Sequence, residues 1–344
     1  MLKFAMFDAK KYDIASFDRN LDPSFISIKY YDTKLTADTV HLAKGCDGVI
    51  VFVNDTLDKT VIDELYALGV RLIALRCAGF NNVDTRAAFG KIHIVRVPAY
   101  SPYAVAEHAM ALLLTLNRKT HKAYIRTRDF NFSLYGLTGF DLHGKTVGVI
   151  GTGKIGKIFI NICRGFGMNV IAYDAFPDTS SDINYVDLDT LFEQSDIVSL
   201  HCPLSNETRH MIDTDALKKM KRSCILVNTS RGGLIHAEAL LAALKEGKIS
   251  GAALDVYEEE GDIFFEDRSD IIVQDDTLSR LISLPNVIVT SHQAFLTQEA
   301  LNNIAQTTLE NIRDFALDKP LENELCYHCM RKEDCRKKRE DRCF

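Results

Sequence analysis

Residues 145–156 read KTVGVIGTGKIG, and residues 169–174 read NVIAYD. The run Thr146–Ile150 is apolar and rich in β-branched side chains, which is typical of a buried strand. Three glycines at G-x-G-x-x-G spacing follow it, beginning with Gly151. The first glycine of this pattern allows a tight turn, the second lets a pyrophosphate approach the backbone, and the third lets the next helix pack closely on the strand. The stretch therefore predicts a β-α-β unit that binds a dinucleotide.

The residues after the glycines indicate which dinucleotide is bound. A helix from about Ile155 to Gly165 would direct its first N–H groups and its dipole at the phosphates. Asp174 ends the next apolar run, where a carboxylate accepts hydrogen bonds from the ribose hydroxyls and repels a 2′-phosphate. No arginine occurs in residues 175–178 to bind that phosphate. We therefore expect NAD rather than NADP. The alternative to dinucleotide binding itself is a glycine-rich turn in which Asp174 is merely a turn residue.

Composition limits the classes of partner. With 344 residues, 47% of them hydrophobic and 26% charged, the chain is long enough for about two globular domains. A net charge of −6 gives no basic footprint, so nucleic acid is not expected as a partner. No segment approaches the ~18 apolar residues of a membrane span and no signal peptide is visible, so we expect no membrane association and a cytoplasmic location. Five cysteines in apolar segments fit reduced, buried thiols: Cys46, Cys77, Cys163, Cys202 and Cys224.

The first 98 residues alternate strand candidates with short helical patterns, which predicts a small parallel α/β domain. The strand candidates are residues 2–7, 25–30, 48–53, 71–75 and 93–97. Two loops that follow these strands, residues 76–82 and 99–102, lie where such folds carry function. Backbone N–H groups near Gly79 could hold a carboxylate, although a plain strand-to-helix turn explains the same residues.

Ser101 and Pro102 predict the start of a long helix that continues to about Arg128. We interpret it as the crossover between two domains, and we interpret Glu107 and His108 as surface charges on it. Further strands are expected at residues 196–200, 224–229, 251–256 and 286–290, with a helix at 237–245 ended by Gly247 and another helix begun by Thr297. The predicted division is a substrate domain of residues 1–101 and 297–325, an NAD-binding domain of residues 102–296, and a tail of residues 326–344.

Ionisable residues follow three of the later strands: Arg231, the acids Asp255 and Glu258–Glu260, and His292. The carboxyl ends of neighbouring parallel strands converge on one crevice. There an arginine can clamp a carboxylate, a histidine can exchange a proton near neutral pH, and a glutamate can stabilise the charged histidine. The set suits a keto acid. The structural alternatives are a turn cation for Arg231, a solvated loop for the glutamates, and a residue at the start of a helix for His292. Chemistry alone does not choose among the three glutamates.

Five segments together resemble the D-isomer-specific 2-hydroxyacid dehydrogenases, and within that family the fermentative D-lactate dehydrogenases. They are VIGTGKIG with YD, VNTSRGGLI, GAALDVYEEEGDIFFED, SHQAFLT and VPAYSPYAVAEHA. The resemblance implies a Rossmann-type NAD-binding domain inserted in a smaller flavodoxin-like α/β catalytic domain. It also implies reversible NADH-dependent reduction of pyruvate to D-lactate. The alternatives are a bulkier 2-keto acid as the substrate, or an NAD(H)-sensing role similar to that of transcriptional corepressors. The partner implied is a second copy of the chain, as a homodimer or a dimer of dimers.

The resemblance assigns roles to residues. The catalytic set is Arg231 as the substrate clamp, His292 as the proton donor and Glu260 as its partner. The cofactor set is Gly151, Thr152, Gly153, Lys154, Ile155, Gly156, Tyr173, Asp174, Cys202, Pro203, Thr229, Ser230 and Asp255. The substrate set is Cys77, Ala78, Gly79, Tyr100, Arg231, His292 and Phe295.

The tail departs from the family. It contains Cys326, Cys329, Cys335 and Cys343 at C-x2-C-x5-C-x7-C spacing, with His328 among them. Four thiols can bind zinc or an iron–sulfur cluster, but this spacing matches no standard ligand pattern. We expect no metal and interpret the tail as a charged appendage, with a redox-sensitive one as the alternative.

Overall fold

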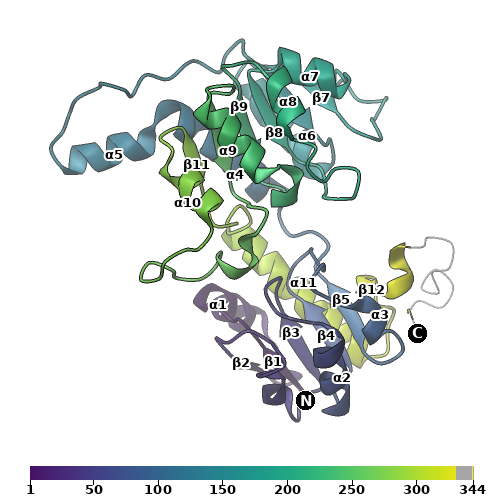
Figure 1. Cartoon of the computed structure of the whole chain (residues 1–344). Coiled ribbons are helices and arrows are strands. Elements are labelled where there is room, and N and C mark those ends of the chain that lie inside the picture. Colours follow the sequence, from purple (N-terminus) through teal and green to yellow (C-terminus); the bar gives the residue numbers. More distant parts are fainter. Residues whose placement is uncertain (331–342, 344) are drawn as a thin grey trace. The chain divides into compact units, whose positions relative to one another are not determined.

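The computed structural model describes residues 1–330 and residue 343 (Figure 1). The chain forms two compact units: residues Met1–Ser101 with Leu296–Phe344, and residues Pro102–Phe295. Since the second unit begins and ends inside the first, it is an insertion in the chain. Each unit has its own parallel sheet and is described by itself.

The first unit contains a six-stranded sheet in the order β12-β5-β4-β3-β1-β2. Its five parallel strands, all predicted from the sequence, are β1 (Leu2–Met6), β2 (Ile26–Tyr30), β3 (Gly48–Val51), β4 (Leu72–Leu75) and β5 (His93–Arg96). The short β12 (Glu324–Leu325) pairs antiparallel with β5 and was not predicted. The order 2-1-3-4-5 of the parallel strands is that of flavodoxin-like folds.

Helices cover this sheet. They are α1 (Lys11–Asn20), α2 (Lys59–Ala67), α3 (Thr85–Ala88) and α11 (Gln298–Ala316), with the 3-10 turns η1 (Val40–Ala43) and η4 (Tyr327–Met330). The hydroxyl of Thr297 accepts a hydrogen bond from the Ala300 N–H and caps α11, as predicted. Helix α11 packs on α1, β4 and β5, so the end of the chain returns to the first unit.

The second unit contains a six-stranded parallel sheet in the order β11-β10-β9-β8-β6-β7. The strands are β6 (Thr146–Ile150), β7 (Asn169–Tyr173), β8 (Ile197–Leu200), β9 (Ile225–Asn228), β10 (Gly251–Leu254) and β11 (Val287–Val289). A classical Rossmann sheet has one more strand outside β7. Here a parallel bridge between Ala172 and Tyr185 occupies that position. The order therefore follows the Rossmann pattern, and its direction reverses between β6 and β8, where such folds bind their ligands.

The helices of the second unit lie on both faces of its sheet. They are α4 (Pro102–Arg118), α5 (Thr120–Arg128), α6 (Lys154–Gly165), α7 (Leu188–Gln194), α8 (Thr214–Lys219), α9 (Ala237–Lys245) and α10 (Asp276–Ser283), with 3-10 turns η2 (Gly232–Leu234) and η3 (Glu260–Asp262). The predicted single helix from Pro102 to Arg128 is wrong in one respect. Lys119 has a left-handed backbone, with φ of 52°, and divides it into α4 and α5.

Alternate residues of each strand enter two separate cores. Val147, Val149 and Val227 pack with α4 and α6 on one face, whereas Val198 and Leu226 pack with α7 to α10 on the other. This burial on both faces explains why the strands read as continuous apolar runs in the sequence. It holds the strand ends, and the residues that follow them, in fixed positions.

No helix in the described part of the chain is both long enough and apolar enough to cross a membrane.

Candidate active site

The glycine loop joins β6 to α6 and packs tightly on the next strand connection. Gly151 has φ of +94°, a conformation that favours glycine, and a Cβ on it would lie 2.5 Å from the Cys202 backbone nitrogen. A Cβ on Gly156 would lie 2.0 Å from the Gly151 carbonyl oxygen. Around Gly153, by contrast, the corresponding space is open. Two glycines are thus required by packing, and the third leaves room for a ligand at the start of α6.

Two further features fit a dinucleotide at this place. The first turn of α6, beginning at Lys154, has N–H groups without partners inside the helix, and these attract phosphate. On the neighbouring β9 connection, the Thr229 hydroxyl is buried and has no hydrogen-bond partner in the structure. The Ser230 hydroxyl donates to the Cys202 carbonyl oxygen at 2.6 Å, which ties the β9 loop to the β8 loop. Burial raises the pKa of the Cys202 thiol to about 11, so this side chain stays uncharged.

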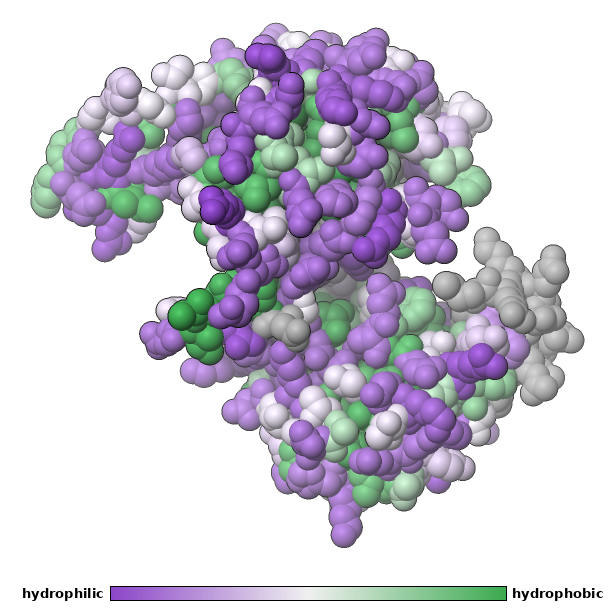
Figure 2. Space-filling model, in the orientation of Figure 1, coloured by the Kyte–Doolittle hydropathy of each residue, from purple (hydrophilic) through white to green (hydrophobic). Residues whose placement is uncertain are grey.

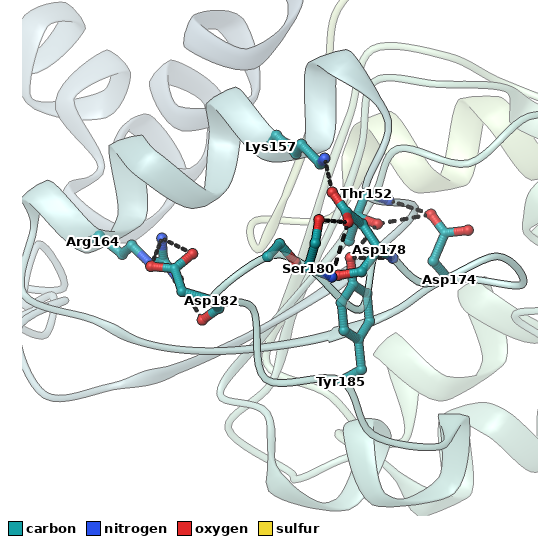
Figure 3. Close-up of polar contacts among 9 residues, drawn as sticks. Thr152, Lys157, Arg164, Asp174, Asp178, Ser180, Asp182 and Tyr185 are labelled. Atoms are coloured by element: carbon teal, nitrogen blue, oxygen red, sulfur yellow. Dashed lines mark hydrogen bonds and ion pairs between the residues drawn. The ribbon is translucent and has the colours of Figure 1, made fainter.

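Asp174 closes the glycine loop from the end of β7 (Figure 3). Its Oδ2 accepts from the Thr152 N–H at 2.7 Å and from the Thr152 hydroxyl at 3.0 Å, and its Oδ1 accepts from the Phe176 N–H at 2.9 Å. Burial opposes ionisation, but the hydrogen bonds from Phe176 and Thr152 outweigh it and lower the pKa of Asp174. Asp174 is therefore an anion at neutral pH, held against the loop that would bind the cofactor.

Figure 3 also shows a cation that the sequence analysis did not consider. Lys157, on the first turn of α6, forms an ion pair with Asp178 at 2.7 Å, and the Ser180 hydroxyl donates to the same carboxylate at 2.6 Å. The nearest lysine is thus engaged by a second acid.

A backbone network fixes the loop that carries Arg231. The Asn228 amide donates to the Arg231 carbonyl oxygen at 2.9 Å and accepts from the Ser230 N–H at 3.0 Å. A Cβ on Gly232 would lie 2.0 Å from the carbonyl carbon of Tyr257, so glycine allows this loop to pack directly on the connection that follows β10. The Arg231 guanidinium donates to the Ser230 carbonyl oxygen at 2.7 Å. The loop with Arg231 and the loop with the three glutamates are thereby neighbours.

Of the three consecutive glutamates, Glu260 is the one that contacts His292. Its Oε1 lies 2.7 Å from the His292 Nδ1, and its Oε2 accepts from the Tyr257 N–H at 3.0 Å. Glu258 instead contacts Arg209 and His210, at 2.9 and 2.6 Å. Glu259 is exposed. The geometry therefore distinguishes among residues that the chemistry of their side chains does not.

The turn that carries His292 is wrapped around the carboxylate of Asp255. This side chain is fully buried, and it accepts from the Thr290 hydroxyl at 2.5 Å and from the N–H groups of Gln293 and Ala294 at 2.9 and 2.8 Å. Burial alone would raise the pKa of Asp255, but these hydrogen bonds and one from His108 lower it. His108 lies on α4 with its Nε2 3.3 Å from the Asp255 Oδ1, so its interpretation as a surface charge is wrong. In the sequence, the signal for this burial was a histidine on a largely apolar face of the predicted helix.

Phe295, a predicted substrate residue, is the last residue of this unit, and its side chain is buried. Near the turn, the ring of Phe265 lies with its centroid 5.8 Å from that of His292. Tyr173 is the last residue of β7, and its carbonyl oxygen accepts from the Gly151 N–H, whereas Pro203 lies in the connection that follows β8. The predicted cofactor residues thus gather at the carboxyl edge of one sheet.

The predicted substrate residues Cys77, Ala78, Gly79 and Tyr100 belong to the first unit, where they follow β4 and β5. Arg96 donates to the Ala78 carbonyl oxygen at 2.8 Å, and the Val97 N–H donates to the Cys77 carbonyl oxygen at 3.2 Å. The Tyr100 carbonyl oxygen accepts from Asn303 of α11. The first unit therefore fixes both loops by backbone contacts, and their role toward a substrate stays a prediction.

The residue before this loop, Arg76, is the largest fully buried side chain of the described chain. Its guanidinium contacts the Asp13 carboxylate at 3.1 Å and the Asp8 carbonyl oxygen at 2.7 Å, and it lies over the Phe52 ring. Burial raises the pKa of Asp13, with the charge of Arg76 opposing that rise. This internal ion pair anchors the start of the Cys77 loop, and it was not predicted from the sequence.

The tail is described only at its ends. Cys326 and Cys343 are buried, and the Cys343 N–H donates to the Glu324 carboxylate at 2.7 Å. The side chain of Cys329 and the whole of Cys335 lie outside the described residues, as does any ligand set that includes them. No cluster of three metal-ligating side chains occurs among the residues that are described.

The fold and the glycine loop define a dinucleotide-binding protein of the Rossmann class. The family model "D-isomer specific 2-hydroxyacid dehydrogenase, NAD binding domain" matches residues 110–294. The chain is 49% identical to the D-lactate dehydrogenase of Escherichia coli, covering 94% of this chain and all of that one, and 50% identical to 2-hydroxyacid dehydrogenase A of Aspergillus oryzae, covering 94% and 95%. A solved structure described as the pyruvate reductase of Chlamydomonas reinhardtii is similar with a TM-score of 0.90 and 45% identity, covering 94% and 98%.

The chain belongs to the D-isomer-specific 2-hydroxyacid dehydrogenases. It is an NAD-binding oxidoreductase, and the predictions of family, fold class and cofactor are confirmed.

Proposed function

We propose that this enzyme reduces pyruvate to D-lactate with NADH, and that it catalyses the reverse reaction with NAD⁺. The observation that carries the proposal is the contact between His292 and Glu260 at the strand ends, beside the loop of Arg231. Similarity to a D-lactate dehydrogenase and to a pyruvate reductase over 94% of the chain supports the choice of substrate.

The residues present fit NADH. The packed glycines, the first turn of α6 and the open space at Gly153 suit the pyrophosphate, Asp174 suits the ribose, and the buried Thr229 hydroxyl lacks a partner that a bound cofactor would provide. When bound, NADH supplies the hydride to the keto carbon. The remaining steps belong to side chains of the protein.

Arg231 is proposed to bind the substrate carboxylate. Its planar guanidinium forms two parallel hydrogen bonds to a carboxylate, which a lysine does not reproduce. The network around Asn228 and the close approach of Gly232 to Tyr257 hold the loop, so the arginine is positioned before the substrate binds. A fixed cation both selects an acid and polarises its ketone.

His292 is proposed to give a proton to the oxygen of the reduced ketone. Because its Nδ1 is engaged by Glu260, the proton leaves from Nε2. A carboxylate beside an imidazole favours the charged imidazolium, which is the form needed for reduction. Oxidation of D-lactate needs the neutral form, which takes the hydroxyl proton while NAD⁺ accepts the hydride. One pair of residues therefore serves both directions.

Cys77, Ala78, Gly79 and Tyr100 are proposed to contribute the other contacts to the substrate, with Phe295 as an apolar neighbour. A relative named for 2-hydroxy acids in general, rather than for lactate, keeps a bulkier 2-keto acid as a second candidate. Initial rates of NADH oxidation with pyruvate, 2-ketobutyrate, 2-ketoisocaproate and phenylpyruvate separate the two. Highest kcat/KM for pyruvate supports the proposal, and a clear preference for a branched or aromatic keto acid contradicts it.

We also propose that two copies associate through the arm formed by residues 119–143. Helix α5 has no buried residue, and large apolar side chains of this arm are exposed, Phe130 by 84% and Tyr135 by 88%. Figure 2 shows hydrophobic surface on this arm. Exposed apolar patches of this kind mark association sites. Light scattering after size exclusion should give a dimer or a multiple of it, and Leu134→Asp should shift the mass toward the monomer.

We propose a cytoplasmic location because of the reduced state of the cysteines. Cys163, Cys202 and Cys224 are buried free thiols, and burial raises the pKa of Cys163 and Cys224 to about 12. Unpaired thiols in this number fit a reducing compartment. Fractionation of the native cells should place the protein with the cytosolic enzymes.

A further inference from the structure

The His292 turn is built around a single buried group, the carboxylate of Asp255. Thr290, Gln293 and Ala294 all donate to that carboxylate, and the His292 N–H donates to the Asp255 carbonyl oxygen at 2.7 Å. The position of the His292 ring therefore depends on where this carboxylate lies.

The backbone of His292 shows why the turn needs support. Its φ is +52°, in the left-handed region that non-glycine residues occupy at a cost of roughly 1 to 2 kcal/mol. Such a conformation persists only where surrounding contacts favour it. Here those contacts are the hydrogen bonds to Asp255, so weakening them would let the turn relax and move the imidazole.

Helix α4 supplies the remaining partner of the carboxylate. The Nε2 of His108 lies 3.3 Å from the Asp255 Oδ1 and 3.2 Å from the Thr290 Oγ1. The one hydroxyl hydrogen of Thr290 is used in its bond to Asp255. Both neighbours of Nε2 therefore act as acceptors, so the His108 Nε2 must carry a hydrogen. These contacts fix the tautomer and orient the ring.

We infer that His108 is a positioning residue for the reaction, which acts by donating its Nε2 hydrogen to the Asp255–Thr290 pair and so holds the turn that carries His292. The inference rests on the proposed function for its effect on turnover. Its geometry joins three elements of one unit, namely α4, the end of β10 and the turn after β11. In the described residues His108 has no other ionic contact, and its neighbour Glu107 is exposed.

The test compares His108→Leu, which removes the donor, with His108→Gln, whose amide nitrogen reaches the Nε2 position without being able to titrate. Loss of a hydrogen bond to a charged group corresponds to a fall in kcat of about 10-fold to 100-fold for the leucine variant. The glutamine variant should recover most of that loss. The dissociation constant for NADH, measured by fluorescence titration, should change little in either variant. Glu107→Gln, one residue away on the exposed face, is the matched control and should behave as wild type.

Equal kcat in wild type and His108→Leu would overturn the inference, and so would equal losses in the leucine and glutamine variants, which indicate a packing role alone. If the wild type and Glu107→Gln reduce pyruvate, the proposed function stands, and these outcomes then overturn only the inference about His108. A second measurement needs no activity: nitrogen-15 spectra of the histidine-labelled enzyme should show His108 protonated at Nε2. A His108 with hydrogen only on Nδ1 would refute the inference, and His108→Leu should shift the His292 resonances.

Discussion

Replacing Glu260 with glutamine removes one charge and nearly preserves the shape of the side chain. The Glu260 Oε1 lies 2.7 Å from the His292 Nδ1, and the two side chains are only 23% and 20% exposed, so solvent screens the interaction in part. A hydrogen bond between charged groups contributes roughly 1.5 to 3 kcal/mol. The glutamine amide oxygen can still accept a hydrogen bond from Nδ1, so the substitution removes the charge rather than the whole contact, and the pH dependence of the rate is the property that should change.

The direction follows from the proton that each reaction needs. Reduction uses the protonated imidazole, so in Glu260→Gln the decline of pyruvate reduction should begin at a lower pH than in wild type. Oxidation uses the neutral imidazole, so the rise of D-lactate oxidation should also move to lower pH, and the variant should retain this direction better near neutrality. The assay is NADH absorbance in both directions, from roughly pH 5 to pH 10.

Two neighbouring variants serve as controls. Glu258→Gln removes a charge that contacts Arg209 and His210, and Glu259→Gln removes one that is exposed. Neither should move the two profiles by a comparable amount. Superimposable profiles for wild type and Glu260→Gln would refute the role of Glu260, and a shift in Glu258→Gln or Glu259→Gln instead would transfer that role to a neighbour.

Four further predictions follow from the same geometry. Asp174→Ser should narrow a strong preference for NADH over NADPH, and equal kcat/KM for both cofactors in wild type would contradict the role of the carboxylate. Arg231→Lys should lower kcat/KM for pyruvate by about 100-fold or more while the NADH dissociation constant stays nearly unchanged, so normal reduction would exclude the clamp. The lowered pKa of Asp255 means that its charge stabilises the fold above about pH 4 and that this contribution disappears as pH falls through the lowered value. Denaturant unfolding should accordingly show a gap between wild type and Asp255→Asn that is constant near neutral pH and closes in acid. Truncation after Leu325 should leave pyruvate reduction unchanged, and stoichiometric zinc or iron that is lost with the tail would contradict the expectation of no metal.

Much of the fold could be predicted because its signals are local. The central strands β3, β4, β8, β9 and β10 are buried along their whole length and therefore form largely apolar runs, and the glycine loop is specified by positions where a Cβ would collide with backbone. The cap at Thr297 and the glycine after α9 are also local features. The break at Lys119 was not predictable, because no glycine or proline marks its left-handed backbone.

The site was less accessible to sequence reasoning, because it depends on contacts between distant residues. The strand-end rule gathered Arg231, Asp255 and His292. The family resemblance selected Glu260, whereas side-chain chemistry alone did not, and the structure shows Glu260 in contact with His292 and Glu258 in contact with His210. His108 lies 147 positions before Asp255 in the chain; its place on a largely apolar helix face indicates burial but does not identify its partner. The internal pair of Arg76 and Asp13 was missed for the same reason.

The central claim is tested most directly by the stereochemistry and stoichiometry of one reaction. The purified enzyme is mixed with pyruvate and a limiting amount of NADH, and after the absorbance falls the lactate enantiomers are separated on a chiral column. One D-lactate should form for each NADH consumed, with no L-lactate. Unchanged NADH absorbance with pyruvate, or lactate of the L configuration, would contradict it.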